Sequence, residues 1–161
     1  MTQVYVAAGS NVEPLANLRR ALAELGRHYR LTCSPAYKNK AVGFEGEDFV
    51  NLVVGFQTDD SIDAVIAHLH EAEAVCGRPR AAPKWAPRTM DLDLLLYGNR
   101  ISDEPGRQLP RPDLLRRAYM LRPLAELAPT LVHPTASKTM RELWREFPGD
   151  HAMVPVTFDV G

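Results

Sequence analysis

The stretch from Lys84 to Gly98 reads KWAPRTMDLDLLLYG and places two carboxylates, Asp91 and Asp93, at the start of an apolar run. Such a run is typical of a buried β-strand, in which residues i and i+2 lie on the same face, roughly 6–7 Å apart. Two like charges at that separation repel each other, so ionising both requires a compensating cation. Arg88 could provide this charge, and a divalent metal ion would do so better. One or two carboxylates, with waters and substrate phosphates, are the usual ligands of magnesium at nucleotide sites.

Around this strand the sequence alternates between strand-like and helix-like patterns. Strands are predicted at residues 3–8, 31–37, 49–58 and 91–97, and helices at 15–25 and 62–76. This order is that of the split βαβ, or ferredoxin-like, fold. We therefore expect an α+β domain with a ferredoxin-like βαββαβ core, a mainly antiparallel sheet and the core helices on one face. Gly9, Ser10 and Asn11 are expected to form a turn, and the chain from Pro110 onward is expected to add extra C-terminal helices.

Two connections, residues 38–48 and 77–90, are long for so small a domain. Long loops of this kind often serve as lids or binding loops, so we expect both to be mobile. The second contains a glycine and three prolines, which exclude a helix or a central strand. It also contains four cations: Arg78, Arg80, Lys84 and Arg88. A solvated basic loop is the plain interpretation, but these cations lead directly into the paired aspartates, which favours an anion-binding loop.

Composition limits the class of protein. Of 161 residues, 45% are hydrophobic and 24% are charged, so we expect one globular domain over residues 1–161. The formal net charge of -1 gives no footprint for a nucleic-acid partner. No run approaches the roughly 18 apolar residues of a membrane span, and the N-terminus enters strand-like sequence without a signal peptide. Cys33 and Cys76 have no metal-type spacing, so we expect reduced thiols in a cytoplasmic protein, and we expect a monomer.

The cations and carboxylates together suit a polyphosphate and its metal ion. In this hypothesis the aspartates hold the metal, the metal bridges phosphate oxygens, and the arginines neutralise the remaining charge bidentately. Positioning and electrostatic stabilisation supply nearly all of the acceleration in phosphoryl-type transfer. The chain contains neither G-x-x-x-x-G-K-[ST] nor G-x-G-x-x-G, so the nucleotide is not held by a phosphate-binding loop or a dinucleotide fingerprint.

Four further residues have both a structural and a functional interpretation. Glu73 continues the apolar stripe of the second predicted helix, where it either pairs with an arginine of the following loop or anchors a polar ligand. Asn51 lies inside a predicted strand, where asparagine is disfavoured, so it is either an edge residue or reads the donors and acceptors of a heterocycle. Phe49 and Tyr119 are either core residues or the two sides of a sandwich around a flat ring.

The segment Lys84–Gly98 resembles the signature of the 6-hydroxymethyl-7,8-dihydropterin pyrophosphokinases, enzymes of folate biosynthesis. The resemblance extends from Val4 to about Phe147. It includes three further matches: Gly9-Ser10-Asn11, Asn51, and the sequence LRPLAELAP at residues 121–129. It implies that ATP donates its β- and γ-phosphates as one unit to the pterin hydroxymethyl oxygen, that AMP leaves, and that two Mg²⁺ ions take part.

The resemblance also implies roles for individual residues. Asp91 and Asp93 would bind both metal ions, and Arg78 and Arg88 would be catalytic arginines that steady charge on the transferred group. The pterin would be held by two aromatic rings, an asparagine amide and backbone groups. The implied pterin-site residues are Asn39, Ala41, Val42, Phe49, Asn51 and Tyr119. The implied ATP-site residues are Ile66, His70, Glu73, Arg80, Lys84, Trp85, Arg88, Leu94, Arg111 and Arg117. The two long loops would close over both substrates.

One departure from the family concerns position 111. Arg111, in the sequence PRPD, stands where the family usually has a histidine that touches the triphosphate, and Pro112 replaces an aromatic residue. An arginine can hold phosphate but cannot shuttle a proton.

Two alternatives therefore accompany the leading hypothesis. The first is a non-catalytic pterin- or nucleotide-binding member of the family, and the second is a phosphotransferase of the same shape that acts on another small heterocycle. Retention of both aspartates and both catalytic arginines argues against the first alternative. Retention of Asn51 and of both aromatic rings argues against the second.

Overall fold

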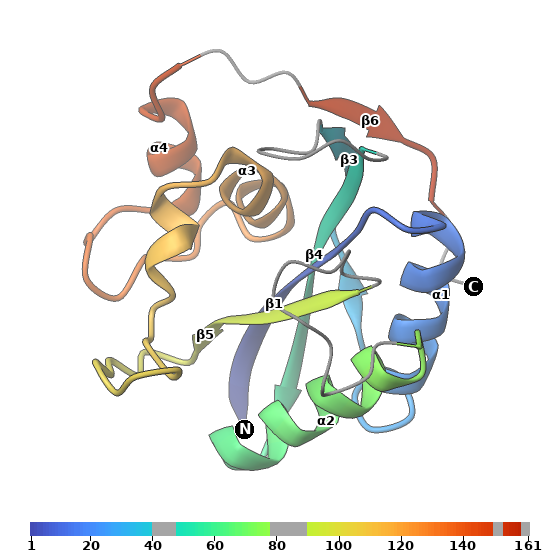
Figure 1. Cartoon of the computed structure of the whole chain (residues 1–161). Coiled ribbons are helices and arrows are strands. Elements are labelled where there is room, and N and C mark those ends of the chain that lie inside the picture. The colour runs from blue at the N-terminus through green and yellow to red at the C-terminus, as the bar shows by residue number, and fades with distance from the viewer. Residues whose placement is uncertain (40–47, 78–89, 150–152, 159–161) are drawn as a thin grey trace.

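Two long strands, β1 (Thr2–Ser10) and β4 (Phe49–Thr58), run antiparallel through the centre of the sheet and pair from Thr2–Thr58 to Ser10–Val50. The computed structural model describes residues 1–39, 48–77, 90–149 and 153–158 (Figure 1). Strand β5 (Asp91–Tyr97) pairs with the other side of β1. The strand that carries the two aspartates therefore lies at one edge of the sheet, beside β1.

Three short strands complete the sheet on the far side of β4. Strands β2 (Thr32–Cys33) and β3 (Ala36–Asn39) pair with β4, and β6 (Val154–Val156) pairs with β3. Every pairing between these strands is antiparallel, and the order across the sheet is β5-β1-β4-β3-β6, with β2 beside β4.

Helices cover both faces of this sheet (Figure 1). Helices α1 (Pro14–Leu25) and α2 (Ile62–Ala74) lie on one face. The 3-10 helix η1 (Pro112–Leu115), α3 (Ala118–Leu127) and α4 (Met140–Arg145) lie on the other. In the part of the chain that the structure describes, no helix is both long enough and apolar enough to cross a membrane.

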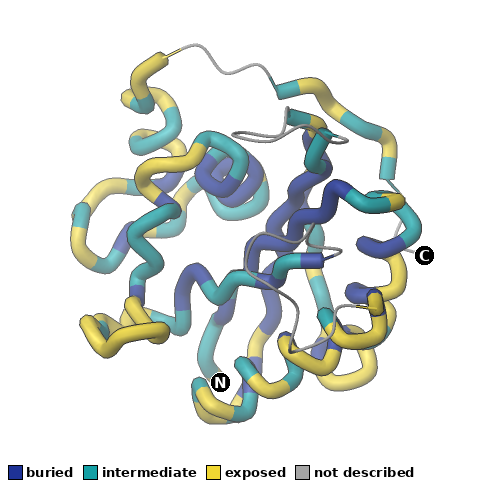
Figure 2. Tube along the Cα trace, in the orientation of Figure 1, coloured by how far each residue is buried: buried dark blue, intermediate teal, exposed yellow. Residues whose placement is uncertain are grey.

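The side chains of the central strands contribute alternately to two hydrophobic cores, because successive side chains of a strand point to opposite faces. Leu52 belongs to the core that contains Leu22 of α1 and Leu69 of α2. Its neighbour Val53 belongs to the core that contains Leu121 of α3 and Met140 at the start of α4. Figure 2 shows that the strands between these two layers are the most deeply buried part of the chain.

The predicted ferredoxin-like core is confirmed. Strand β4 lies between β1 and β3, and β1 lies between β4 and β5, so each βαβ unit encloses a strand of the other. The two core helices share one face, as predicted, and the extra C-terminal helices cover the opposite face. Of the two predicted long connections, 38–48 and 77–90, the first begins later than predicted, because Lys38 and Asn39 belong to β3. Residues 40–47 and 78–89 lie outside the described residues.

The predicted turn at Gly9 and Ser10 is wrong, because both residues belong to β1. Gly9 pairs with Asn51 of β4 on one side and with Asp91 of β5 on the other. A glycine inside a strand often marks a place where a neighbouring group approaches closely. Next to Gly9 this group is the Asn51 side chain.

The predicted strand at residues 31–37 is interrupted. Cys33 pairs with Val54 and Tyr37 with Asn51, so four steps on this strand face three on β4, which is a bulge of one residue. Within the bulge, the Ser34 hydroxyl accepts the Val53 N–H at 2.8 Å, and the Ser34 N–H donates to the Val53 carbonyl at 2.8 Å.

The sequence predicts helices in the region after Pro110, but this region ends in a strand, β6. This strand, with the sequence VPV, extends the sheet beyond β3. A proline lacks a backbone N–H and is tolerated in a strand at the margin of a sheet, which explains why a proline-containing segment pairs here.

We expect Ser34→Ala to destabilise the fold. The substitution removes the side-chain acceptor of the buried Val53 N–H, and an unsatisfied buried donor costs about 1–3 kcal/mol. Urea denaturation of Ser34→Ala and of a control, Thr130→Ala, at an exposed position after α3, measures this cost. Equal free energies of unfolding for the two variants would contradict the role of the Ser34 hydroxyl.

Candidate active site

The two aspartates lie at the start of β5, on the face of the sheet that α3 covers. Asp91 pairs with Gly9 and Asp93 with Ala7 across the β1–β5 ladder. Leu95, two residues further on, belongs to the core beneath α3, whereas Leu92 belongs to the core beneath α1 and α2. Both carboxylates are partly buried. The i, i+2 spacing therefore places them on one face, as the sequence predicts.

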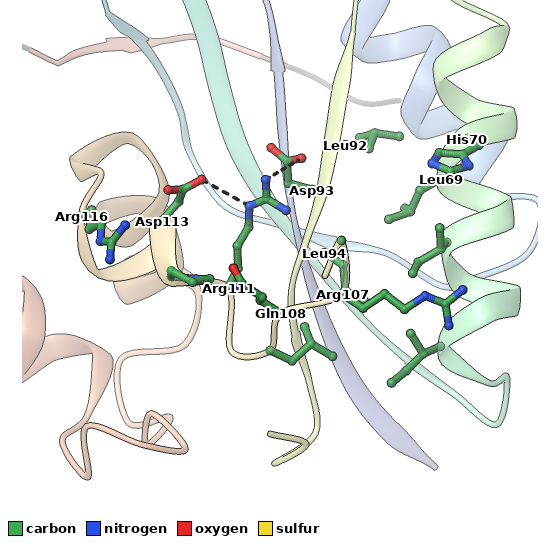
Figure 3. Close-up of a pocket in the computed structure, with 15 residues that line it drawn as sticks. Leu69, His70, Leu92, Asp93, Leu94, Arg107, Gln108, Arg111, Asp113 and Arg116 are labelled. Carbon is green, nitrogen blue, oxygen red and sulfur yellow. Dashed lines mark ion pairs between the residues drawn. The ribbon is translucent and has the colours of Figure 1, made fainter. Parts of the chain in front are cut away.

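Two cavities meet at this carboxylate pair. The smaller, about 240 Å³, lies over β1, β4 and β5 beside α3, and both aspartates line it. The larger, about 560 Å³, lies between α2, β5 and the segment that leads into η1, and Asp93 lines it too (Figure 3). A group bound in one cavity is thus adjacent, across Asp93, to a group bound in the other.

The smaller cavity combines apolar walls with two amides. The Asn51 side chain, only 7% exposed, donates from Nδ2 to Asn39 Oδ1 at 2.6 Å. Phe49 and Tyr119 also line this cavity, and burial raises the pKa of the Tyr119 phenol, so the ring stays neutral. An apolar slot with fixed amide donors and acceptors suits a flat heterocycle.

Gly9 makes room for the Asn51 amide. A Cβ atom placed on Gly9 would lie 2.3 Å from Asn51 Oδ1, far inside contact distance. The side chain of Asn51 therefore lies across the backbone of the neighbouring strand, where only glycine leaves space for it. This close approach explains why a glycine stands at this position of β1.

The larger cavity follows the outer edge of β5. The backbone groups on this edge bond to neighbouring segments: the Leu92 N–H donates to Glu73 Oε2 at 2.9 Å, and the Leu95 carbonyl accepts the Arg111 N–H at 2.9 Å. These two bonds hold α2 and the segment before η1 on either side of Asp93. Glu73 therefore has a structural role in positioning β5, and the arginines considered as its partners lie outside the described residues.

Arg111 supplies a cation at the aspartates. Its Nη2 lies 3.5 Å from Asp93 Oδ1, and its Nε lies 3.5 Å from Asp113 Oδ2 (Figure 3). The Nε atom is buried and makes no hydrogen bond to any described residue. Arg111 thus offsets part of the charge of the aspartate pair, and because it lines the larger cavity its guanidinium could contact an anion bound there.

The structure brings most of the predicted residues that it describes to these cavities. Asn39, Phe49, Asn51 and Tyr119 line the smaller cavity, and Ile66, His70, Leu94 and Arg111 line the larger. Arg117 is exposed at the N-terminus of α3 and lines neither. The other predicted site residues lie outside the described residues: Ala41, Val42, Arg78, Arg80, Lys84, Trp85 and Arg88.

Sequence reasoning missed several residues that line the cavities. In the smaller cavity these include Gly9 and Met120. In the larger cavity they include Arg107, Gln108, Asp113 and Arg116. One signal was available: four arginines fall between residues 107 and 117, a concentration that the overall charge conceals.

Comparison with protein families identifies what this chain is similar to. A family model described as 7,8-dihydro-6-hydroxymethylpterin-pyrophosphokinase matches residues 5–129. The 2-amino-4-hydroxy-6-hydroxymethyldihydropteridine pyrophosphokinase of Haemophilus influenzae is 36% identical over 159 residues, which cover 96% of this chain and 98% of that protein. The protein of the same name from Pseudomonas aeruginosa is 38% identical over 137 residues, which cover 82% of this chain and 84% of that protein.

Solved structures give a similarity of fold. A Plasmodium falciparum HPPK-DHPS A437G structure with SDX-DHP superposes with a TM-score of 0.70 at 12% identity and covers 91% of this chain. An HPPK-DHPS structure in complex with substrates gives a TM-score of 0.67, also at 12% identity. This chain spans 45% and 43% of those two solved chains, respectively.

We expect Gly9→Ala to displace the Asn51 side chain, because the new methyl group would overlap Oδ1. Loss of the Asn51–Asn39 hydrogen bond should lower the free energy of unfolding by about 0.5–1.5 kcal/mol. A double-mutant cycle tests the cause: in an Asn51→Ala background the same glycine substitution should cost less. If Gly9→Ala costs as much in that background as in the wild type, the close approach is not the reason for the glycine.

Proposed function

Because the chain belongs to the 7,8-dihydro-6-hydroxymethylpterin-pyrophosphokinase family, we propose that it transfers pyrophosphate from ATP to the hydroxymethyl group of 6-hydroxymethyl-7,8-dihydropterin, a step of folate biosynthesis that releases AMP. One observation carries this proposal. An amide-lined slot and a larger cavity with several arginines meet at one carboxylate pair, so two substrates can lie end to end.

The smaller cavity would bind the pterin. The Asn51 and Asn39 amides would recognise the donors and acceptors at the edge of the heterocycle, and Phe49 and Tyr119 would stack on its faces. The resemblance adds backbone groups around Ala41 and Val42. Support comes from the size and lining of the cavity, and from the bond that holds the Asn51 amide in one orientation.

The larger cavity would bind ATP. Ile66 and Leu94 provide apolar surface, His70 provides a polar group, and Arg111 faces the aspartates, where the phosphates would lie. Glu73 would act by holding β5 in place. The remaining residues proposed for this site rest on the resemblance alone: Arg80, Lys84, Trp85, Arg88 and Arg117.

Asp91 and Asp93 would hold Mg²⁺, two ions if the resemblance holds. Carboxylate oxygens are the hard ligands that this ion prefers, and two of them in one partly buried position fit it. Magnesium bound there would neutralise phosphate charge and lower the repulsion between the aspartates. Within the described residues, Arg111 is the cation that lies near Asp93 at 3.5 Å.

The transfer itself requires chiefly alignment. The pterin hydroxymethyl oxygen forms a bond to the β-phosphorus of ATP and loses its proton, while the bond from that phosphorus to the oxygen it shares with the α-phosphate breaks and AMP departs. The protein contributes by placing the hydroxymethyl group in line with the breaking bond and by stabilising charge. Arg78 and Arg88 would steady the transferred group, as the resemblance implies.

We also propose that the protein acts in the cytoplasm. Cys33 and Cys76 are both free thiols, which suits the reducing cytoplasm. We propose that residues 1–161 act as a single domain and as a monomer, with the two small molecules as partners.

Incubation with ATP, Mg²⁺ and 6-hydroxymethyl-7,8-dihydropterin tests the proposed function. We expect one AMP for each pterin diphosphate formed, measured by chromatography. ADP as the product would indicate a simple kinase, and binding of both ligands without turnover would indicate the non-catalytic alternative. Either result would overturn the proposal.

We expect Asp91→Ala to reduce kcat by at least about a hundredfold, because charge stabilisation at the reacting phosphates is lost. Asp103→Ala, which removes an exposed aspartate from the loop after β5, is the control and should retain full activity. Steady-state measurement of AMP release compares the two. Near-normal turnover by Asp91→Ala would show that the metal assignment is wrong.

We expect Arg111→Ala to weaken ATP binding by about tenfold or more, as loss of a charged hydrogen-bond donor implies, and to change pterin binding much less. Calorimetric titration with each ligand separates the two effects. Arg141→Ala, at an exposed position on α4, is the matched control. Equal losses for ATP and pterin would place Arg111 outside the triphosphate site.

A further inference from the structure

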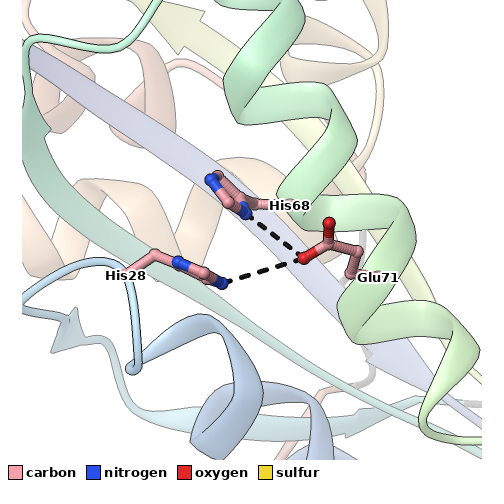
Figure 4. A group of neighbouring side chains, drawn as sticks. All are labelled: His28, His68 and Glu71. Atoms are coloured by element: carbon pink, nitrogen blue, oxygen red, sulfur yellow. Dashed lines mark hydrogen bonds and ion pairs between the residues drawn. The ribbon is translucent and has the colours of Figure 1, made fainter.

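A second group of potential metal ligands lies away from both cavities, where α1 ends beside α2 (Figure 4). His28 lies three residues beyond the end of α1, and His68 and Glu71 lie one turn apart on α2. All three are accessible to solvent. Ile66 and His70 of the same helix line the larger cavity, so α2 presents different sides to the cavity and to this cluster.

The donor atoms of the cluster converge on one oxygen. His68 Nδ1 lies 3.3 Å and His28 Nε2 lies 3.7 Å from the same atom, Glu71 Oε2 (Figure 4). All three donor atoms lie within 4.8 Å of one another. Ligands of a tetrahedral zinc ion, with bonds of about 2.0–2.1 Å, are about 3.3–3.4 Å apart. The three donor atoms therefore have roughly the spacing that such an ion requires, and binding would turn the two rings so that both nitrogens point to the ion.

The two imidazoles contact each other and a carboxylate of the neighbouring segment. Their rings stack, with centroids 3.7 Å apart and planes inclined by 28°. The other nitrogen of His68, Nε2, lies 3.9 Å from Asp60 Oδ2, and this oxygen accepts the Tyr29 hydroxyl at 2.7 Å. The Tyr29 ring is buried and stacks on Phe56, so the carboxylate behind His68 is fixed from the core. A carboxylate that accepts a hydrogen bond from a ligating histidine is a common support in metal sites, and Asp60, at 3.9 Å, would move closer to His68 to provide one.

We propose that His28, His68 and Glu71 form a three-ligand site for a zinc ion, separate from the aspartate pair. Imidazole nitrogens favour zinc and related transition metals, whereas the all-oxygen aspartate pair favours magnesium. Solvent would complete the coordination. Zinc bound there links the turn after α1 to α2 and so stabilises the helical layer that borders the larger cavity.

Calorimetric titration with Zn²⁺ in an excess of Mg²⁺ tests this proposal. The excess Mg²⁺ competes with zinc for the aspartate pair. We expect the wild-type chain to bind one zinc ion at this cluster and His28→Gln to weaken that binding by at least about tenfold. His70→Gln, which removes a histidine of the same helix outside the cluster, should bind zinc as the wild type does. Equal zinc affinity in His28→Gln and the wild type would overturn the proposal.

Thermal unfolding provides a second measurement. Zinc that binds only the folded chain raises Tm, and EDTA should reverse the increase. The increase should be lost in His28→Gln and in Glu71→Gln, both of which change exposed side chains and leave the cores intact. If zinc raises Tm equally in these variants, the ion acts at another place and the three-ligand site does not exist.

Discussion

The arrangement of the candidate site depends on the pairing of β1 with β4 on one side and with β5 on the other. This register places Gly9 between Asn51 and Asp91, so an amide and a carboxylate from strands far apart in sequence lie on the same face. A slip of one residue on either side would turn these side chains to the opposite face, into the core beneath α1 and α2. The two hydrophobic cores, which require alternate residues to face them, therefore also fix the position of the polar groups.

The charge of the aspartate pair explains what surrounds it. Two carboxylates on one strand face repel each other. In the described structure Arg111 offsets part of this charge, because its backbone bonds to β5 and its side chain faces Asp93. On the other side, Glu73 accepts a backbone N–H of β5 and so fixes the strand without adding charge on the aspartate face. The site is thus assembled from an edge strand whose outer backbone groups bond to the elements that border the larger cavity.

Helix α2 contributes both to the larger cavity and to the cluster of His28, His68 and Glu71. Ile66 and His70 border the larger cavity, and Glu73 holds β5, whereas His68 and Glu71 meet His28 at the end of α1. A helix of thirteen residues can serve these neighbours because positions three or four apart share a side, while those two apart do not. Any ion that restrains α2 at the histidine cluster therefore acts on an element that also borders the proposed nucleotide site.

The sequence by itself determined the ferredoxin-like order of elements and the placement of Asp91 and Asp93 on one strand face, because both follow from short-range periodicity. It also indicated Asn51, Phe49 and Tyr119 as candidate binding residues, because an amide and two aromatic rings suit a flat heterocycle. Only the tertiary structure decided that Gly9 belongs to a strand, that a bulge at Ser34 interrupts another strand, and that β6 pairs with β3. It alone brought Arg111 to Asp93 and His28 to His68. These contacts depend on register and on packing between distant segments, and the periodicity of a single segment carries no information about its partner.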